Sequence, residues 1–224
     1  MFADVVTLDS GPSSAIGEHV LAGKSLPIAY SSFFNQQSSN PGGSHTFQTM
    51  ISRGFSRLKG CLVSFYNPPG TAGVPAGNGT TEVNGFWGWH LITDSLVPDR
   101  DQMDIFIQLG NRVMPEHHVT SLSEAFYRLR LAVGKYAGDN QMAITPREFR
   151  CNKFILAWDF ETGALQAGGG LSFTGLSSRS GELLTIQAKN MSAAPGGAGP
   201  SSVYVTLHYD AILQLNLDSA VVLD

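Results

Sequence analysis

The chain has 224 residues, a formal net charge of −4 at pH 7 and 14% charged residues, whereas an average soluble protein has about 25%. This length allows one large β domain that buries its own core without disulfide bonds. The acidic balance excludes a broad basic surface, so we expect no sequence-specific nucleic acid partner. Because no apolar run reaches the length of a membrane span, we also expect no transmembrane segment. With so few charges, much of the surface must be uncharged polar or covered by other subunits.

Short runs rich in β-branched and aromatic residues recur along the whole chain, and each is bounded by Gly, Pro, Asn or Ser. This pattern predicts β-strands. The expected strands lie at 4–8, 45–52, 57–66, 85–92, 103–110, 149–160, 181–188 and 203–217, with a further one at 25–34.

The expected strand at 149–160 is apolar on both faces. Leu156 and Trp158 lie on one face, and Ile155 and Ala157 lie on the other. Such a strand is expected to be central in its sheet and covered on both sides.

One segment has a helical period. Ser121 and Glu124 form a capping box, and Gly134 suits the end of a helix, which predicts a helix at about 121–133. We expect Arg128 and Arg130 to point outward. The residues expected to face the sheet are Leu122, Phe126, Leu129 and Val133.

The final predicted strand is unusually long, because every odd position from Val203 to Leu217 is apolar. In a sandwich such a strand is expected to be core, and it can bend in the middle and pass from one sheet toward the other. Eight to ten antiparallel strands, one short inserted helix and long end loops together predict an all-β jelly-roll sandwich. Its expected bounds are 26–224, with an N-terminal arm or linker at 1–25.

The candidate ligand sites are weak. In the segment 17–25, Gly17 lies six residues before Gly23, whereas a phosphate-binding P-loop needs five. The adjacent His117 and His118 of the segment 115–118 would point to opposite sides of an extended chain, so we expect a polar loop leading into the helix.

The motifs of catalysis are also missing. The chain has no G-x-S-x-G nucleophile elbow, and the segment 175–181 is expected to be a turn. A carboxylate pair for glycoside hydrolysis stays open, because distance in space cannot be taken from sequence. Cys61 and Cys151 lie in apolar runs and are expected to be buried free thiols. We therefore expect no catalytic, cofactor-binding or metal residues, no cofactor and no enzyme activity.

The last third of the chain, "FTGLSSRSGELLTIQAKN" followed by "SSVYVTLHYDAILQLNLDSAVVLD", resembles the C-terminal end of major capsid proteins of polinton-like and related double-stranded DNA viruses. The segment "HHVTSLSEAFYRLRLAVG" resembles the helix inserted between strands in the same proteins. The resemblance covers about 100–224, with only the strand pattern matching at 26–66. These proteins belong to the double-jelly-roll lineage shared with adenovirus hexons and tectivirus capsids.

The resemblance implies a homotrimeric capsomer in an icosahedral shell. Its implied location is the virion, and its implied partners are neighbouring capsomers together with penton and minor capsid proteins. Proteins of this lineage carry two jelly rolls, whereas this chain has strands for one. The C-terminal half of a double jelly roll, a truncated product and a single-jelly-roll relative remain alternatives.

The alternative function is a jelly-roll carbohydrate-binding, lectin-like module. Trp87 and Trp89 would share one face of the expected strand at 85–92 and Phe86 the other, which suits either a sugar platform or core packing. A cupin or glycosidase would need a metal triad or an acid pair.

Overall fold

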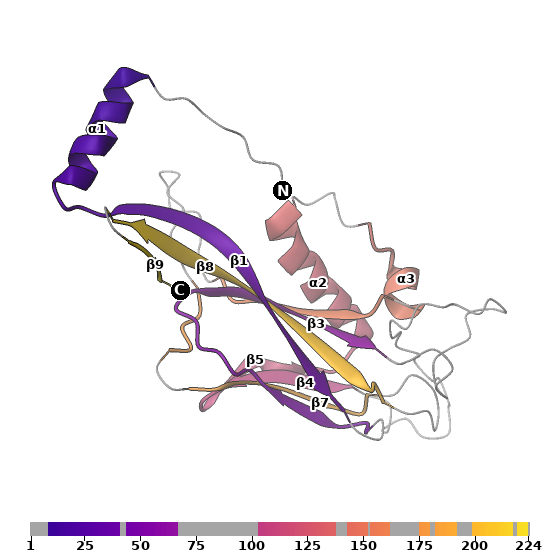
Figure 1. Ribbon diagram of the computed structural model, residues 1–224. Helices are drawn as coiled ribbons and strands as arrows, with labels where there is room; N and C mark the ends of the chain where they lie inside the picture. Colours follow the sequence, from indigo (N-terminus) through magenta and orange to yellow (C-terminus); the bar gives the residue numbers. More distant parts are fainter. Residues whose placement is uncertain are drawn as a thin grey trace, which may run out of the picture. The chain divides into compact units, whose positions relative to one another are not determined.

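The computed structural model describes residues 9–40, 44–66, 103–137, 143–151, 153–161, 175–179, 182–191, 199–216 and 219–223 (Figure 1). The expected strands at 4–8 and 85–92, the loop at 67–85 and part of the loop at 189–202 lie outside the described residues. The strands are β1 (Leu26–Ser39), β2 (Phe47–Met50), β3 (Leu58–Tyr66), β4 (Asp104–Leu109), β5 (Arg112–Val119), β6 (Ile155–Asp159), β7 (Leu184–Lys189), β8 (Ser202–Leu215) and β9 (Ala220–Leu223). The helices are α1 (Ser10–Leu21), α2 (Leu122–Ala137) and α3 (Pro146–Cys151).

The strands form two sheets with a rolled order. The first sheet has the order β1-β8-β3-β6, with β9 paired to the end of β8, and the second has the order β2-β7-β4-β5. Within these sheets β1 lies beside β8, β2 beside β7, β3 beside β6 and β4 beside β5. These are the pairs of one long eight-strand hairpin that has been rolled up, which is a jelly roll. The predicted fold class is therefore confirmed.

The core lies between the two sheets and follows the period-two alternation of the strands. Phe47 of β2 packs edge-on against Phe65 of β3, with ring centroids 5.6 Å apart, so the two sheets face each other through these rings. The buried inward residues of the first sheet are Cys61, Val63, Phe65, Leu156, Trp158, Val203, Val205 and Leu207. Those of the second sheet are Phe47, Thr49, Ile105, Ile107, Leu109, Leu184, Ile186 and Ala188.

The helix α2 covers the outer face of the first sheet at β6. In Figure 1, α2 and the second sheet lie on opposite sides of β3 and its neighbours, and α2 lies close along β6. Ala157 is buried on this outer face while Leu156 and Trp158 are buried on the inner face. The expected cover on both sides is thus confirmed, but β6 is the edge strand of the described sheet rather than a central strand.

The predicted helix exists, but its end and its neighbours differ from the expectation. It continues through Gly134 to Ala137, so Gly134 does not end it. The stretch expected as a strand from 149 to 160 begins as the short helix α3, and its strand starts only at Ile155. A second helix that the apolar pattern did not indicate, α1, lies where a detached arm was expected.

The segment 115–118 is part of β5, not the loop that the sequence predicts. Ile107 pairs with Met114 and Ile105 pairs with Val119. The chain therefore advances by five residues along β5 where it advances by two along β4. The intervening residues bulge from the edge of the sheet. The two polar histidines therefore sit on a bulge, where alternation of side chains does not hold.

The long terminal strand is confirmed as β8, but it stays in one sheet. Its first part pairs with β3 and its last part, Ile212–Leu215, pairs with β9. The inward residues are buried as far as Ala211, after which the strand is half-exposed. The described chain separates here into two compact units, one comprising residues up to Ser32 with those from Asp210 onward, and the other Phe33–Tyr209. The expected boundary between an arm at 1–25 and a domain at 26–224 stays a prediction.

Candidate assembly surface

The segment that most resembles a phosphate loop is the end of a helix. Gly17 lies inside α1, and Gly23 follows in a turn with φ of 74°. A P-loop needs a strand before the glycine-rich turn and a helix after it, so the arrangement here has the opposite order. This order of elements, like the spacing of Gly17 and Gly23, does not fit a P-loop.

His118 is held by groups on the outer face of the second sheet. Its Nδ1 lies 2.5 Å from Asp104 Oδ1, and its ring stacks on Phe106 with centroids 4.1 Å apart. Lys189 Nζ lies 3.6 Å from the other oxygen of Asp104. His117, the adjacent residue, is exposed on the bulge. This cluster anchors the edge of the sheet, and the two histidines do not converge on one point.

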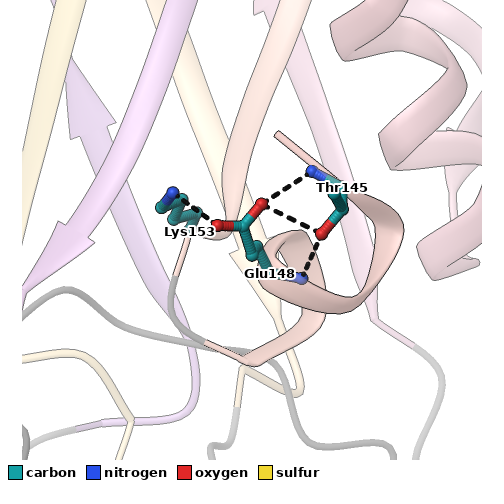
Figure 2. A network of polar contacts seen from close by, with 3 residues as sticks. All are labelled: Thr145, Glu148 and Lys153. Carbon is teal, nitrogen blue, oxygen red and sulfur yellow. Dashed lines mark hydrogen bonds and ion pairs between the residues drawn. The ribbon is translucent and has the colours of Figure 1, made fainter. Parts of the chain in front are cut away.

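The carboxyl of Glu148, whose pKa is lowered, also has a structural role. Figure 2 shows Glu148 closing the first turn of α3, where its Oε2 accepts hydrogen bonds from the backbone N–H and the hydroxyl of Thr145, both at 2.9 Å. Lys153 Nζ lies 2.9 Å from Oε1. The bond from Lys153, then those from Thr145, lower the pKa of Glu148 to about 2. Thr145 and Glu148 form a capping box that the sequence shows as T-P-R-E.

The remaining chemistry-bearing side chains are also built into the fold. The Ser178 hydroxyl accepts a hydrogen bond from the Phe55 N–H at 2.9 Å, so this part of the expected turn 175–181 is packed against the core. Cys61 is a buried free thiol as predicted, and burial raises its pKa. The side chain of Cys151, and the aromatics Phe86, Trp87 and Trp89, lie outside the described residues. Among the residues that the structure describes, no group of three or more His, Cys, Asp or Glu could hold a metal ion.

No helix in the described ranges combines the length and the apolar character needed to cross a membrane.

Among the residues that the structure describes, the outer face of β1 and β8 carries exposed aromatic side chains. We call this the outer strip and define it by Phe33, Asn35 and Gln37 of β1, Tyr204 and Thr206 of β8, and Tyr66 at the end of β3. Phe33 is 59% exposed and stacks on the ring of His208, with centroids 4.8 Å apart. Tyr204 is 38% exposed and meets Tyr66 edge-on at 6.5 Å.

The outer strip contains aromatic and amide side chains but no charged residue. Interface cores are depleted in charge and enriched in aromatic residues relative to other surface. The alternation in the sequence identifies which residues share this face, but it cannot show that α2 covers β6 and leaves β1 and β8 open. These residues were therefore missed as a site, and the exposed Phe33 in a run of polar residues was the available signal.

The side of α2 that faces away from the sheet carries a second set of exposed apolar residues. Ala125, Leu129 and Ala132 are buried toward the sheet. Tyr127 and Leu131 lie one turn apart on the opposite side and are 61% and 48% exposed. We call this pair the helix crown. Tyr127 and Leu131 lie at positions that a single amphipathic helix would fill with polar residues.

Charges beside the helix crown are partly neutralised within the helix. Arg128 Nη2 lies 2.8 Å from Glu124 Oε1, so this pair is satisfied without a partner molecule. Arg130 is exposed as predicted, while Arg128 is half-buried and paired rather than simply outward. Ser121 accepts a hydrogen bond from the Glu124 N–H at 3.2 Å, which confirms the hydroxyl half of the predicted capping box.

The unit formed by the two chain ends has exposed apolar residues of its own. In α1 none of the 12 residues is buried, and Leu21 is 75% exposed. All four residues of β9 are exposed, including Val221, Val222 and Leu223. An isolated helix of this length is marginal in water. Within this unit, the described residues therefore leave α1 and β9 without the burial that would stabilise them.

Comparison with known proteins gives matches only among solved structures, because no family model and no curated protein matches the chain. The chain is similar to the capsid of the virus PBCV-1, at 14% identity and a TM-score of 0.47, and to the PBCV-1 protein VP54 fitted into the virophage Sputnik, at 13% and 0.49. Each match covers 97% of this chain and 55% of the other, so this chain spans about half the length of those proteins. A structure of the Sputnik virophage aligns with 89% of this chain and 39% of its own, at 12% identity and a TM-score of 0.41.

Proposed function

We propose that this chain is a structural subunit of an icosahedral viral capsid and that it resides in the virion. The observation that carries the proposal is the jelly-roll order of the two sheets, since viral capsid proteins are among the main users of this fold. The last third of the sequence resembles capsid proteins of double-stranded DNA viruses, which favours a capsid protein over the other kinds of protein that use this fold.

The distribution of apolar and charged residues supports an assembled state. The outer strip, the helix crown and the exposed side of α1 and β9 present aliphatic and aromatic residues on a protein with 14% charged residues. Contiguous exposed apolar surface on a soluble domain marks an interaction site. A shell subunit has neighbours on several flanks, so it needs fewer charges than a free monomer.

We propose a homotrimer as the working unit. Its contacts would use the flanks of the sandwich and the segments around 67–85 and 189–202, which are rich in Gly, Pro, Ala and Ser. Neighbouring capsomers, and penton and minor capsid proteins, would be the further partners. A stable contact of this kind buries more than about 1,000 Å² and has an apolar centre.

In this proposal the chain has no catalytic role. The titratable residues that look most like a site, Glu148 and the His118 cluster, each hold local structure together, as their contacts in α3 and on the second sheet indicate. A lectin-like jelly roll is the competing function, because lectins share the fold.

Electron microscopy of the expressed chain, alone and together with any shell it forms, tests the proposal. We expect capsomers with threefold symmetry and a pseudo-sixfold outline. Retention on a sugar resin by a protein that stays monomeric at every concentration would favour the lectin-like function instead. A tightly bound metal found by mass spectrometry in such a monomer would favour a cupin.

A further inference from the structure

The outer face of the first sheet has two levels. Over β6 it is raised by α2, and over β8 and β1 no other described element packs on the residues of the outer strip, which are exposed or half-exposed. A helix with its side chains is about 10 Å across, so the helix crown stands about that far above the outer strip. The raised and the open areas lie side by side on one face, in the strand order β6-β3-β8-β1.

The open area has the dimensions of the helix beside it. The stretch 33–39 of β1 spans about 23 Å, and two neighbouring strands present a band about 10 Å wide. The helix α2 has 16 residues, which corresponds to about 24 Å in length. An α2 from a second molecule therefore fits along the strip.

The surface chemistry also matches. Tyr127 and Leu131 would lie over the strip between Phe33 and Tyr204, so apolar and aromatic side chains would share the contact. The residues that define the strip carry no charge. On the helix side Glu124 and Arg128 pair with each other, and the exposed Arg130 flanks the crown, where its long side chain can reach water beyond the strip. A contact made this way buries no unpaired charge as long as Arg130 stays at its rim.

We propose that two copies of this chain associate face to face about a twofold axis, with the helix crown of each copy seated on the outer strip of the other. Because the crown and the strip lie side by side on the same face, a twofold rotation places both contacts at once, as an isologous interface requires. Seating the crowns on each other would leave both strips open. The proposal goes beyond the trimeric capsomer, since this pairing would join two subunits whether or not a shell forms.

The estimated size of the interface is that of a small, weak contact. One seated helix covers about 240 Å² of strip, and both contacts counted on both partners bury about 1,000 Å², which is the lower limit for a specific interface. A contact of this size fits a weak dimer with a dissociation constant in the micromolar range, about 1–100 µM.

Sedimentation equilibrium of the full chain tests this pairing. We expect the wild-type chain to form dimers in that range, and Leu131→Lys and Phe33→Lys to weaken dimerisation at least about tenfold, because each places a charge within the contact. Both positions are exposed, so the monomer should remain folded, which a thermal melt checks. Gln48→Lys, at an exposed position on the outer face of the second sheet, is the matched control and should change the dissociation constant by less than about twofold.

Hydrogen exchange at concentrations below and above the dissociation constant locates the contact. We expect added protection in 33–39, 202–209 and 122–131 together, and none in 47–50. Protection of the helix without the strip would indicate contact between crowns and would overturn the proposal. A wild-type chain that stays monomeric up to about 500 µM, or a dimer weakened equally by Gln48→Lys, would overturn it too. These results do not depend on shell formation, so capsomers seen without this dimer would leave the proposed function standing.

Discussion

Replacing Leu207 by Asp tests the inward face of the long strand β8. Leu207 is fully buried, pairs with Cys61 of β3 and lies between the buried Val205 and Tyr209. A carboxylate placed there meets apolar side chains from the inner face of the sandwich. The variant therefore probes whether the alternation in the sequence marks the true core.

The expected cost of Leu207→Asp has three parts. Loss of the leucine side chain costs about 2–5 kcal/mol, and burial of a polar group without a partner adds about 1–3 kcal/mol. Holding the carboxyl protonated at pH 7 adds about 4 kcal/mol, because an unperturbed Asp has a pKa of about 3.9. The total of about 7–12 kcal/mol is comparable with the whole net stability of a domain, about 5–15 kcal/mol.

We expect Leu207→Asp to be insoluble or unfolded at pH 7, as followed by tryptophan fluorescence in urea. Burial raises the pKa of the new carboxyl in the folded state, so the destabilisation grows as the pH rises above about 4 and is smaller at pH 4. The control is Thr206→Asp, one residue away on the half-exposed outer face, which should unfold within about 1 kcal/mol of wild type. A soluble Leu207→Asp protein with the wild-type urea midpoint would refute the assignment of this face to the core.

Three further variants or measurements test the packing and the polar contacts. Leu129→Ala should lower the free energy of unfolding by about 2–5 kcal/mol. Phe126 is only half-buried, so Phe126→Ala should cost less than the loss of about 3–5 kcal/mol expected at a fully buried Phe. A urea titration in which Phe126→Ala costs more than Leu129→Ala would contradict the orientation of α2. Because the pKa of Glu148 is lowered to about 2, its contacts stabilise the fold above pH about 4.5 and are lost as the pH falls from there to about 2. The difference in urea midpoint between wild type and Glu148→Gln should therefore vanish as the pH falls through this window. A difference that stays constant with pH would exclude the charge of Glu148 as its cause. Cys61 should resist alkylation at pH 8 in the native chain and react in urea, because burial raises the pKa of its thiol. Peptide mass spectrometry after alkylation measures this difference. Labelling of Cys61 in the native chain would place the thiol at the surface.

The sequence predicts most of the sandwich because its strands obey a simple period. Val203, Val205 and Leu207 alternate with polar residues, and this pattern is decided by burial of one face. The pattern fails where local capping competes with it. The Thr145–Glu148 capping box and the proline at the first turn start α3 in a stretch whose aromatic residues suggest a strand.

The end of α2 shows a second limit of local rules. Gly134 has the chemistry of a helix end, yet the helix continues to Ala137. Helices of this kind are stabilised mainly by tertiary packing rather than by propensity, and α2 lies along β6. A glycine inside a helix costs about 1 kcal/mol relative to alanine, which is less than the burial of one large apolar side chain contributes.

The outer strip and the helix crown could not be predicted from the sequence for a different reason. A residue such as Phe33 appears on an exposed face only when the order of strands and the place of α2 are known, because both are set by contacts between residues far apart in the chain. Tyr127 and Leu131 are exposed for the same reason, since the stripe of α2 that meets the sheet is formed by Ala125, Leu129 and Ala132. An isolated subunit gains nothing by exposing these residues to water, whereas a subunit whose outer face meets another copy does. In the proposed assembly, where another copy covers this face, the low charge of the chain and the exposed aromatic residues have one physical explanation.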